Sequence, residues 1–160
     1  MATTHRYHAH CSWSGSTGAG YDRYRRDHAA SAPPAEVELS LSSDPAFRGD
    51  PARLNPEQLL VLAASSCQLL SFLAVAARAR LDVVDYRDQA VGEMPEDDPP
   101  LRLTRIVLRP RITLVPPTDG RLNEDRVRHL IEVAHRQCYI ANSLTTAVVV
   151  EPTIVAALAP

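Results

Sequence analysis

The sequence contains no lysine: all 17 basic residues are arginine, against 19 acidic residues, and the net charge is −2. The arginines are dispersed among the acids, and no basic stripe alternates with aromatic residues, which argues against a nucleic-acid-binding protein. The first residues lack the apolar core of a signal peptide, and we expect no membrane-spanning helix. These absences predict a cytoplasmic protein.

Cysteine is also scarce, because the chain has only Cys11, Cys67 and Cys138. Three scattered thiols are too few for the disulfide framework of a secreted protein. Neither Cys67 nor Cys138 has the closely spaced Cys or His partner that structural zinc requires. His8 and His10 flank Cys11, but neighbouring strand residues face opposite ways, so we expect no metal site there. Catalysis, redox sensing and simple packing remain open for the thiols.

With 160 residues, 45% of them hydrophobic, the chain is long enough for a single domain spanning residues 1–160. Strands flanking two helices predict an α+β fold with helices on one side of antiparallel sheets. The Tyr21–His28 segment is either a polar strand or an extended loop. The remaining expected strands are Arg6–Trp13, Glu36–Leu41, Val83–Val91, Leu101–Val115 and Ala147–Val155.

Alternation within these strands predicts which residues face the core. In the first strand Tyr7, Ala9, Cys11 and Trp13 share one face, which places Cys11 in the core. In the next strand Val37, Leu39 and Leu41 are expected to face inward. Proline lacks the amide that a sheet needs, so Pro110 implies a bulge or an edge position, and Pro152 interrupts the last strand.

A long helix is predicted from Asn55 to about Arg80. Asn55 is a good N-cap, Pro56 suits the first helical position, and Glu57 is favourable in the first turn. The helix is apolar on nearly every face, which indicates burial in a core or against a partner. Cys67 lies near its middle.

A second helix is predicted from about Asn123 to Tyr139, with Asn123 as its cap. Its apolar stripe comprises Val127, Leu130, Ile131, Ala134 and Cys138. We therefore expect Cys138 to be buried.

The long helix cannot activate Cys67 through its own dipole. The thiol lies 12 residues beyond Asn55, about 18 Å along the axis, and the dipole effect fades after the first turn. Burial raises a thiol pKa, so a reactive Cys67 is expected to need a cation. A unit positive charge 4 Å from the thiolate, at an effective dielectric constant near 20, stabilises it by roughly 4 kcal/mol. That energy lowers the thiol pKa by about three units. The candidates are Arg23, Arg25 and Arg26.

Glu57 precedes Cys67 by 10 residues, about 15 Å along the helix. One arginine cannot easily bridge both groups within a single chain. If two copies of the helix pack antiparallel about Leu62, Glu57 of one copy lies across from Cys67 of the other. The spacing therefore predicts a homodimer with composite sites.

The run Asn55-Pro56-Glu57-Gln58-Leu59-Leu60, followed by Ala64-Ser65-Ser66-Cys67, resembles the signature of the OsmC/Ohr family of osmotically inducible and organic hydroperoxide resistance proteins. The resemblance extends to Trp13 with its Gly-rich loop, the segment around Arg25 and Arg26, and Cys138 followed by Ser143. Gln68 departs from the pattern, because many relatives have an apolar or aromatic residue there.

The resemblance implies an intertwined α+β homodimer, with an OsmC-like fold, that reduces organic hydroperoxides. Cys67 matches the peroxidatic cysteine and Cys138 the resolving cysteine. Glu57 matches the glutamate that pairs with the active-site arginine, and that arginine maps best onto Arg26. The implied cycle passes through a Cys67 sulfenic acid and a Cys67–Cys138 disulfide, with a dithiol reductant such as a lipoylated protein. It needs no metal or organic cofactor.

Two alternatives remain open at this point. One is a non-catalytic OsmC-like protein that binds a small ligand and uses its cysteines only for packing. The other is a redox sensor that signals through the same disulfide.

Overall fold

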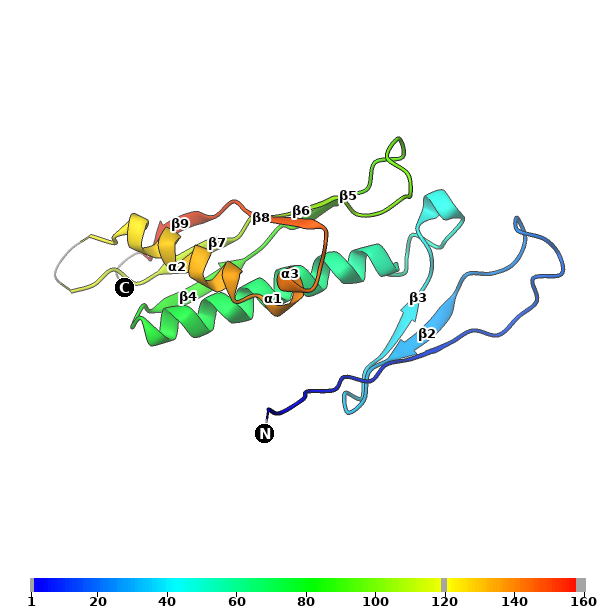
Figure 1. Cartoon of the computed structure of the whole chain (residues 1–160), viewed down its shortest axis with the longest axis horizontal. Coiled ribbons are helices and arrows are strands. Elements are labelled where there is room, and N and C mark those ends of the chain that lie inside the picture. Colours follow the sequence, from blue (N-terminus) through cyan, green and yellow to red (C-terminus); the bar gives the residue numbers. More distant parts are fainter. Residues whose placement is uncertain (1, 119–120, 158–160) are drawn as a thin grey trace. The chain divides into compact units, whose positions relative to one another are not determined.

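The computed structural model describes residues 2–118 and 121–157. The chain forms two compact units, one ending at Leu59 and one beginning at Leu60. In the first unit, β1 (His10–Ser12), β2 (His28–Ser31) and β3 (Glu38–Leu41) form an antiparallel sheet with β2 in the middle (Figure 1). A short 3-10 helix, η1 (Pro45–Phe47), follows.

The N-terminal strand is shorter and more exposed than its alternation predicts. The expected strand from Arg6 to Trp13 is reduced to the three residues of β1, and Cys11 is exposed rather than in the core. Val37 precedes β3 and is 65% exposed, whereas Leu41 is 3% exposed. Alternation requires a layer that covers one face of the sheet, and the described residues of this unit supply only η1 beside it. The segment before β2 is a loop, one of the two expected forms.

The long helix is confirmed as α1 (Pro56–Arg78). Asn55 and Gln58 form a reciprocal cap: the Gln58 amide donates to Asn55 Oδ1 at 2.8 Å, and the Asn55 amide donates to Gln58 Oε1 at 3.0 Å. After the helix, Arg80 adopts a positive φ of 58°, and the Leu81 amide returns to the Ala76 carbonyl. Such a left-handed residue is a common helix stop.

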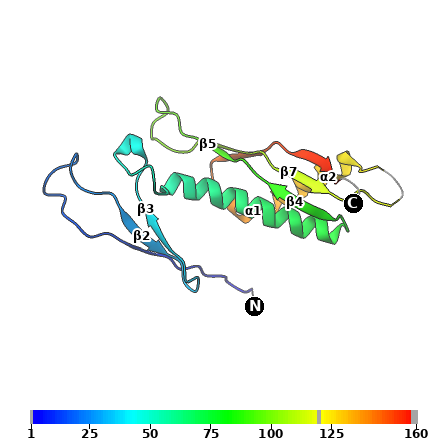
Figure 2. The ribbon, with the colours of Figure 1, turned by 180° about the vertical axis from the view of Figure 1, so that it is seen from behind.

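The second unit contains two three-stranded sheets, and each has the second of its strands along the chain in the middle. One sheet joins β4 (Val83–Arg87), β7 (Arg111–Leu114) and β9 (Thr153–Ala156) in that order, and Figure 2 shows β4 and β7 beside α1. The other joins β5 (Val91–Glu93), β6 (Arg105–Leu108) and β8 (Ala147–Val150). Three expected strands are therefore each divided in two.

The α+β prediction is confirmed, but the expectation of purely antiparallel sheets is wrong. β8 runs parallel to β6 and β9 runs parallel to β7, because a long connection that contains α2 joins each middle strand to the last strand of its sheet. Pro110 is fully buried between two middle strands rather than at an edge or bulge. It is tolerated because the hydrogen-bond ladder breaks there, and Pro152 falls at the matching break between β8 and β9.

Asp88 ties α1 to this break. Its Oδ1 accepts a hydrogen bond from the Arg109 amide at 2.7 Å, and its Oδ2 accepts one from the Ser65 hydroxyl at 2.5 Å. Ser65 lies on α1, two residues before Cys67. This contact fixes the position of α1 along its own axis and its rotation about that axis relative to the sheets.

The second expected helix is present but ends early. α2 (Glu124–Arg136) begins at its Asn123 cap, and a separate short helix, α3 (Tyr139–Asn142), follows. The main core joins α1, β7 and α2 through Phe72, Val75, Ala76, Ile112, Leu114, Val127, Ile131 and Ala134. A smaller cluster joins α1 to β6 through Ala64, Ile106 and Leu108.

α1 is more apolar than its burial requires. Residues 58–77 carry no charge, so α1 could cross a membrane by length and composition alone, although no such segment is expected from the sequence. Core helices satisfy the same criterion, and one face of α1 is buried through Ala64, Gln68, Phe72, Val75 and Ala76. On the remaining surface Leu62 is 57% and Leu70 is 63% exposed.

Candidate functional site

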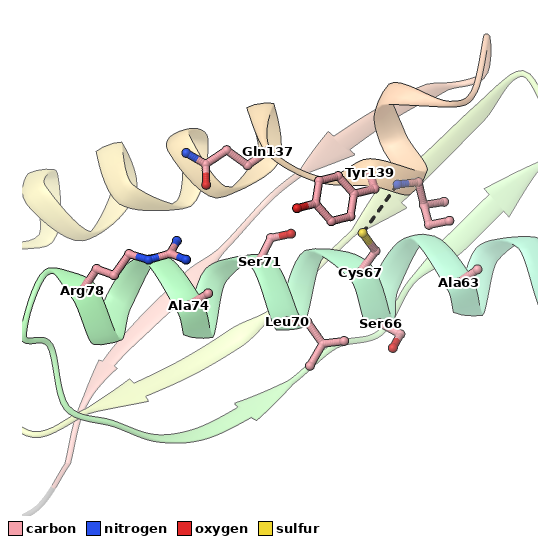
Figure 3. Close-up of a pocket in the computed structure, with 10 residues that line it drawn as sticks. Ala63, Ser66, Cys67, Leu70, Ser71, Ala74, Arg78, Gln137 and Tyr139 are labelled. Atoms are coloured by element: carbon pink, nitrogen blue, oxygen red, sulfur yellow. Dashed lines mark hydrogen bonds between the residues drawn. The ribbon is translucent and has the colours of Figure 1, made fainter. Parts of the chain in front are cut away.

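A groove of about 490 Å³ runs along α1 beside Cys67 (Figure 3). Residues at helical spacing form its floor, so they share one face of α1. The segment around α3 forms the opposite wall. The lining residues are Ala63, Ser66, Cys67, Leu70, Ser71, Ala74, Arg78, Gln137, Tyr139 and Ile140.

The structure brings Cys67 and Cys138 together. Cys138 follows the end of α2 and is 1% exposed, as the apolar stripe predicts, whereas Cys67 is only half-buried. The two thiols are close enough for each to shift the pKa of the other, and both are free. Sequence spacing could not show this contact, because 71 residues separate the two positions.

The surroundings of Cys67 favour its thiolate. Burial is the largest single influence on its pKa and raises it, but hydrogen bonds outweigh burial and leave the pKa below its ordinary value. The donors are the Ile140 amide, the Cys138 thiol, the Tyr139 amide and the Ser71 hydroxyl. The Ile140 nitrogen lies 3.5 Å from Cys67 Sγ (Figure 3). The expectation that only a cation could offset burial is therefore wrong.

Cys138 is shifted in the opposite direction. Burial raises its pKa to about 11, and its contact with Cys67 adds to the rise because a neighbouring thiolate disfavours a second negative charge. At neutral pH Cys138 is thus a protonated thiol that can donate to Cys67. The opposite shifts make Cys67 the thiol that loses its proton first and Cys138 the one that keeps it.

The sequence did not predict the main-chain amides that donate to Cys67. The apolar stripe continues through Cys138 and the helix is predicted to run to about Tyr139, so the Tyr139 amide is expected to be already bonded within it. The chain instead leaves α2 after Arg136 and starts α3 at Tyr139. The first amides of a helix have no intrahelical acceptor, and here they face Cys67.

Arg78 lies at the far end of the groove. It is 11 residues beyond Cys67, about 16 Å along the axis. At that distance it cannot hold the thiolate. Within the part of the second unit that the structure describes, the lowered pKa of Cys67 thus comes from hydrogen bonds.

The predicted arginine and glutamate belong to the first unit. The Arg26 guanidinium donates to the carbonyls of Tyr21 and Tyr24, at 2.6 Å each, and lies 3.9 Å from the Tyr24 ring centroid. Arg25 pairs with Asp27 at 3.1 Å. Glu57 occupies the first turn of α1. The approach of Arg26 and Glu57 to Cys67 stays a prediction.

Arg26 also lines a second cavity, of about 420 Å³, within the first unit. Trp13 and Tyr24 form part of its wall and meet edge to face, with ring centroids 6.3 Å apart. Among the described residues, no three His, Cys, Asp or Glu side chains are close enough to hold a metal ion.

The profile of the family described as "OsmC-like protein" matches residues 49–153, which include α1, both thiols and most of the second unit. The chain belongs to the OsmC-like family. The family resemblance and the OsmC-like fold that the sequence implied are thereby confirmed. No curated protein matches this OsmC-like chain.

Solved structures agree with this assignment. An OsmC-like protein of unknown function from Vibrio cholerae is 27% identical, with a TM-score of 0.83 over 94% of this chain and 100% of that one. An organic hydroperoxide resistance protein from Elizabethkingia anophelis is 18% identical, with a TM-score of 0.70 over 98% and 100%. A Legionella pneumophila protein, described as the organic hydroperoxide resistance protein OsmC, is 16% identical, with a TM-score of 0.66 over 96% and 99%. At these identities the last two show the fold alone.

Proposed function

We propose that this OsmC-like protein is a cysteine-based, thiol-dependent peroxidase that reduces organic hydroperoxides. The contact between Cys67 and Cys138, with pKa shifts of opposite sign, carries the proposal. A half-exposed thiolate is a nucleophile that a substrate can reach. A buried thiol beside it suits a resolving residue, because it cannot compete for the substrate.

The first step is attack by the Cys67 thiolate on the terminal oxygen of the hydroperoxide. The O–O bond breaks, the sulfur becomes a sulfenic acid, and the alkoxide takes a proton to leave as an alcohol. Cys138 then attacks the sulfenic sulfur, and water and a Cys67–Cys138 disulfide are formed. An external dithiol, of which a lipoylated protein is one candidate, attacks the more exposed sulfur and regenerates both thiols. A cytoplasmic location fits this dependence on reduced thiols, and we include it in the proposal.

The proposed active unit is a homodimer with composite sites. In it, Glu57 and Arg26 come from the first unit of one chain, and Cys67 and Cys138 come from the other chain. Support comes from the exposed apolar surface of α1, where Leu62, Leu70 and Leu73 are 57%, 63% and 38% exposed. Exposed apolar surface of this kind marks an interaction site.

The proposal is tested by counting thiols. Reduced protein is treated with tert-butyl hydroperoxide without reductant, and free thiols and intact mass are then measured. We expect one equivalent to remove two thiols per chain and leave Cys11 free. Cys67→Ser should lose no thiol at comparable speed, and Cys11→Ser should behave like the unaltered protein. Retention of all three thiols in the unaltered protein would refute the peroxidase proposal and favour a ligand-binding role.

A further inference from the structure

The Ser71 hydroxyl occupies a distinctive place in the groove. Ser71 follows Cys67 by four residues, so it lies one helical turn further along the same face of α1. Both residues line the groove, and the Ser71 hydroxyl is close enough to Cys67 to contribute to the lowering of its pKa. In Figure 3 the Ser71 side chain points into the space between α1 and Tyr139. The peroxidase steps described above leave this hydroxyl without a role.

The spacing of Cys67 and Ser71 matches the dimensions of a peroxide under attack. A near-attack geometry places the reacting oxygen roughly 3–3.5 Å from the sulfur. The leaving oxygen is one bond further along the same line. Side chains at positions i and i+4 of a helix have Cβ atoms about 5–6 Å apart, so a leaving oxygen directed along the groove comes within reach of the Ser71 hydroxyl.

We propose that Ser71 is a catalytic residue that hydrogen-bonds the departing oxygen of the hydroperoxide. This inference rests on the proposed peroxidase function. As the Cys67 thiolate bonds to the terminal oxygen, the O–O electron pair moves onto the alkoxide oxygen. The Ser71 hydroxyl donates its proton to that oxygen, and solvent water returns a proton to Ser71. The products are the Cys67 sulfenic acid, a neutral alcohol and the hydroxide left when solvent water reprotonates Ser71, so atoms and charge balance.

Other polar groups of the groove suit this role less well. The Ser66 hydroxyl points away from the Cys67 sulfur in Figure 3. Arg78 is about 16 Å along the axis from Cys67. Tyr139 is 80% exposed, so water competes for its hydroxyl. Ser71 alone among these lies close enough to Cys67 to lower its pKa.

The test compares two oxidants whose leaving groups differ in basicity. Tert-butyl hydroperoxide releases a strongly basic alkoxide, whereas peracetic acid releases acetate, which needs little help. Oxidation of Cys67 is followed in single turnover at a pH above its pKa, so that every variant is fully thiolate. We expect Ser71→Ala to slow the reaction with tert-butyl hydroperoxide about 10- to 100-fold, the effect of one hydrogen bond to a charged oxygen. The reaction with peracetic acid should change less than about threefold.

Matched variants separate this role from others. Thr153→Ala removes an exposed hydroxyl from β9, outside the groove, and should leave both reactions unchanged. Ser71→Thr and Ser71→Val have the same shape, and only Ser71→Thr should retain the reaction with tert-butyl hydroperoxide; this pair serves even if Ser71→Ala does not fold. Equal losses with both oxidants, or no loss with either, would overturn the role of Ser71 while the peroxidase function stands. Inactivity of the unaltered protein would overturn both.

Discussion

Removal of the Cys138 thiol should weaken Cys67 as a thiolate. Cys138 donates one of the hydrogen bonds that lower the pKa of Cys67. A hydrogen bond to a charged group contributes about 1.5–3 kcal/mol, and sulfur is a weak donor, so the lower limit applies. At 1.36 kcal/mol per unit, Cys138→Ala should raise the pKa of Cys67 by about one unit. The pKa of Cys67 rises because the hydrogen-bond donor that is lost had stabilised its deprotonated form.

Alkylation measures this shift without any peroxide. The rate of Cys67 modification by iodoacetamide is recorded across pH in a Cys11→Ser background, so that only the site thiols react. At a pH well below both pKa values, Cys138→Ala should react about tenfold more slowly, because its thiolate fraction is about tenfold lower. The rate at high pH should be unchanged.

The amide donors provide the built-in control. They remain in Cys138→Ala, so the pKa of Cys67 should not rise by several units. An unchanged or lowered pKa would refute the view that the buried thiol donates to Cys67. A shift of several units would instead show that Cys138 holds the amides of α3 in place.

Three further outcomes are expected. The pKa of Cys138 is raised from 9.0 to about 11, so the stability that its protonated thiol contributes is complete below pH 9 and is lost as pH rises towards 11. Denaturant unfolding should show a loss of about 3 kcal/mol in the free energy of unfolding over this range. A Cys138→Ala protein with the same pH dependence would contradict this. Gln68 is 1% exposed with Oε1 unpaired, so Gln68→Leu should raise the free energy of unfolding by about 1–2 kcal/mol; a lower midpoint would indicate that the amide is needed. Mixing inactive Glu57→Gln and Cys67→Ser chains should restore activity in heterodimers, and no recovery at any ratio would exclude shared sites.

The helices could be predicted from the sequence because their signals are local. Asn55 and Asn123 each precede an acidic first turn, and both begin helices within a residue of the expected position. The strands were less predictable. Their breaks at Pro110 and Pro152 depend on how three strands align, and Asp88 bridges the break through a contact with α1.

The site was predictable only in part. Cys67 and Cys138 were assigned roles through the family resemblance, since no spacing rule places two residues 71 apart in contact. The end of α2 at Arg136 was not predictable, because Cys138 continues the apolar stripe. Ser71 did leave a signal in the sequence: a hydroxyl four residues after a thiol on a helix falls on the same face. Cys11 was misplaced because alternation says nothing about whether a second layer exists.

The use of main-chain donors at Cys67 separates reactivity from specificity. The amides of Tyr139 and Ile140 belong to the backbone, so any substitution there except proline keeps both N–H groups. The side chains at the same positions form the groove wall and are free to change. Under the proposed function, variants of Tyr139 therefore alter which hydroperoxides enter while Cys67 keeps its acidity, so this position is the natural starting point for engineering substrate preference.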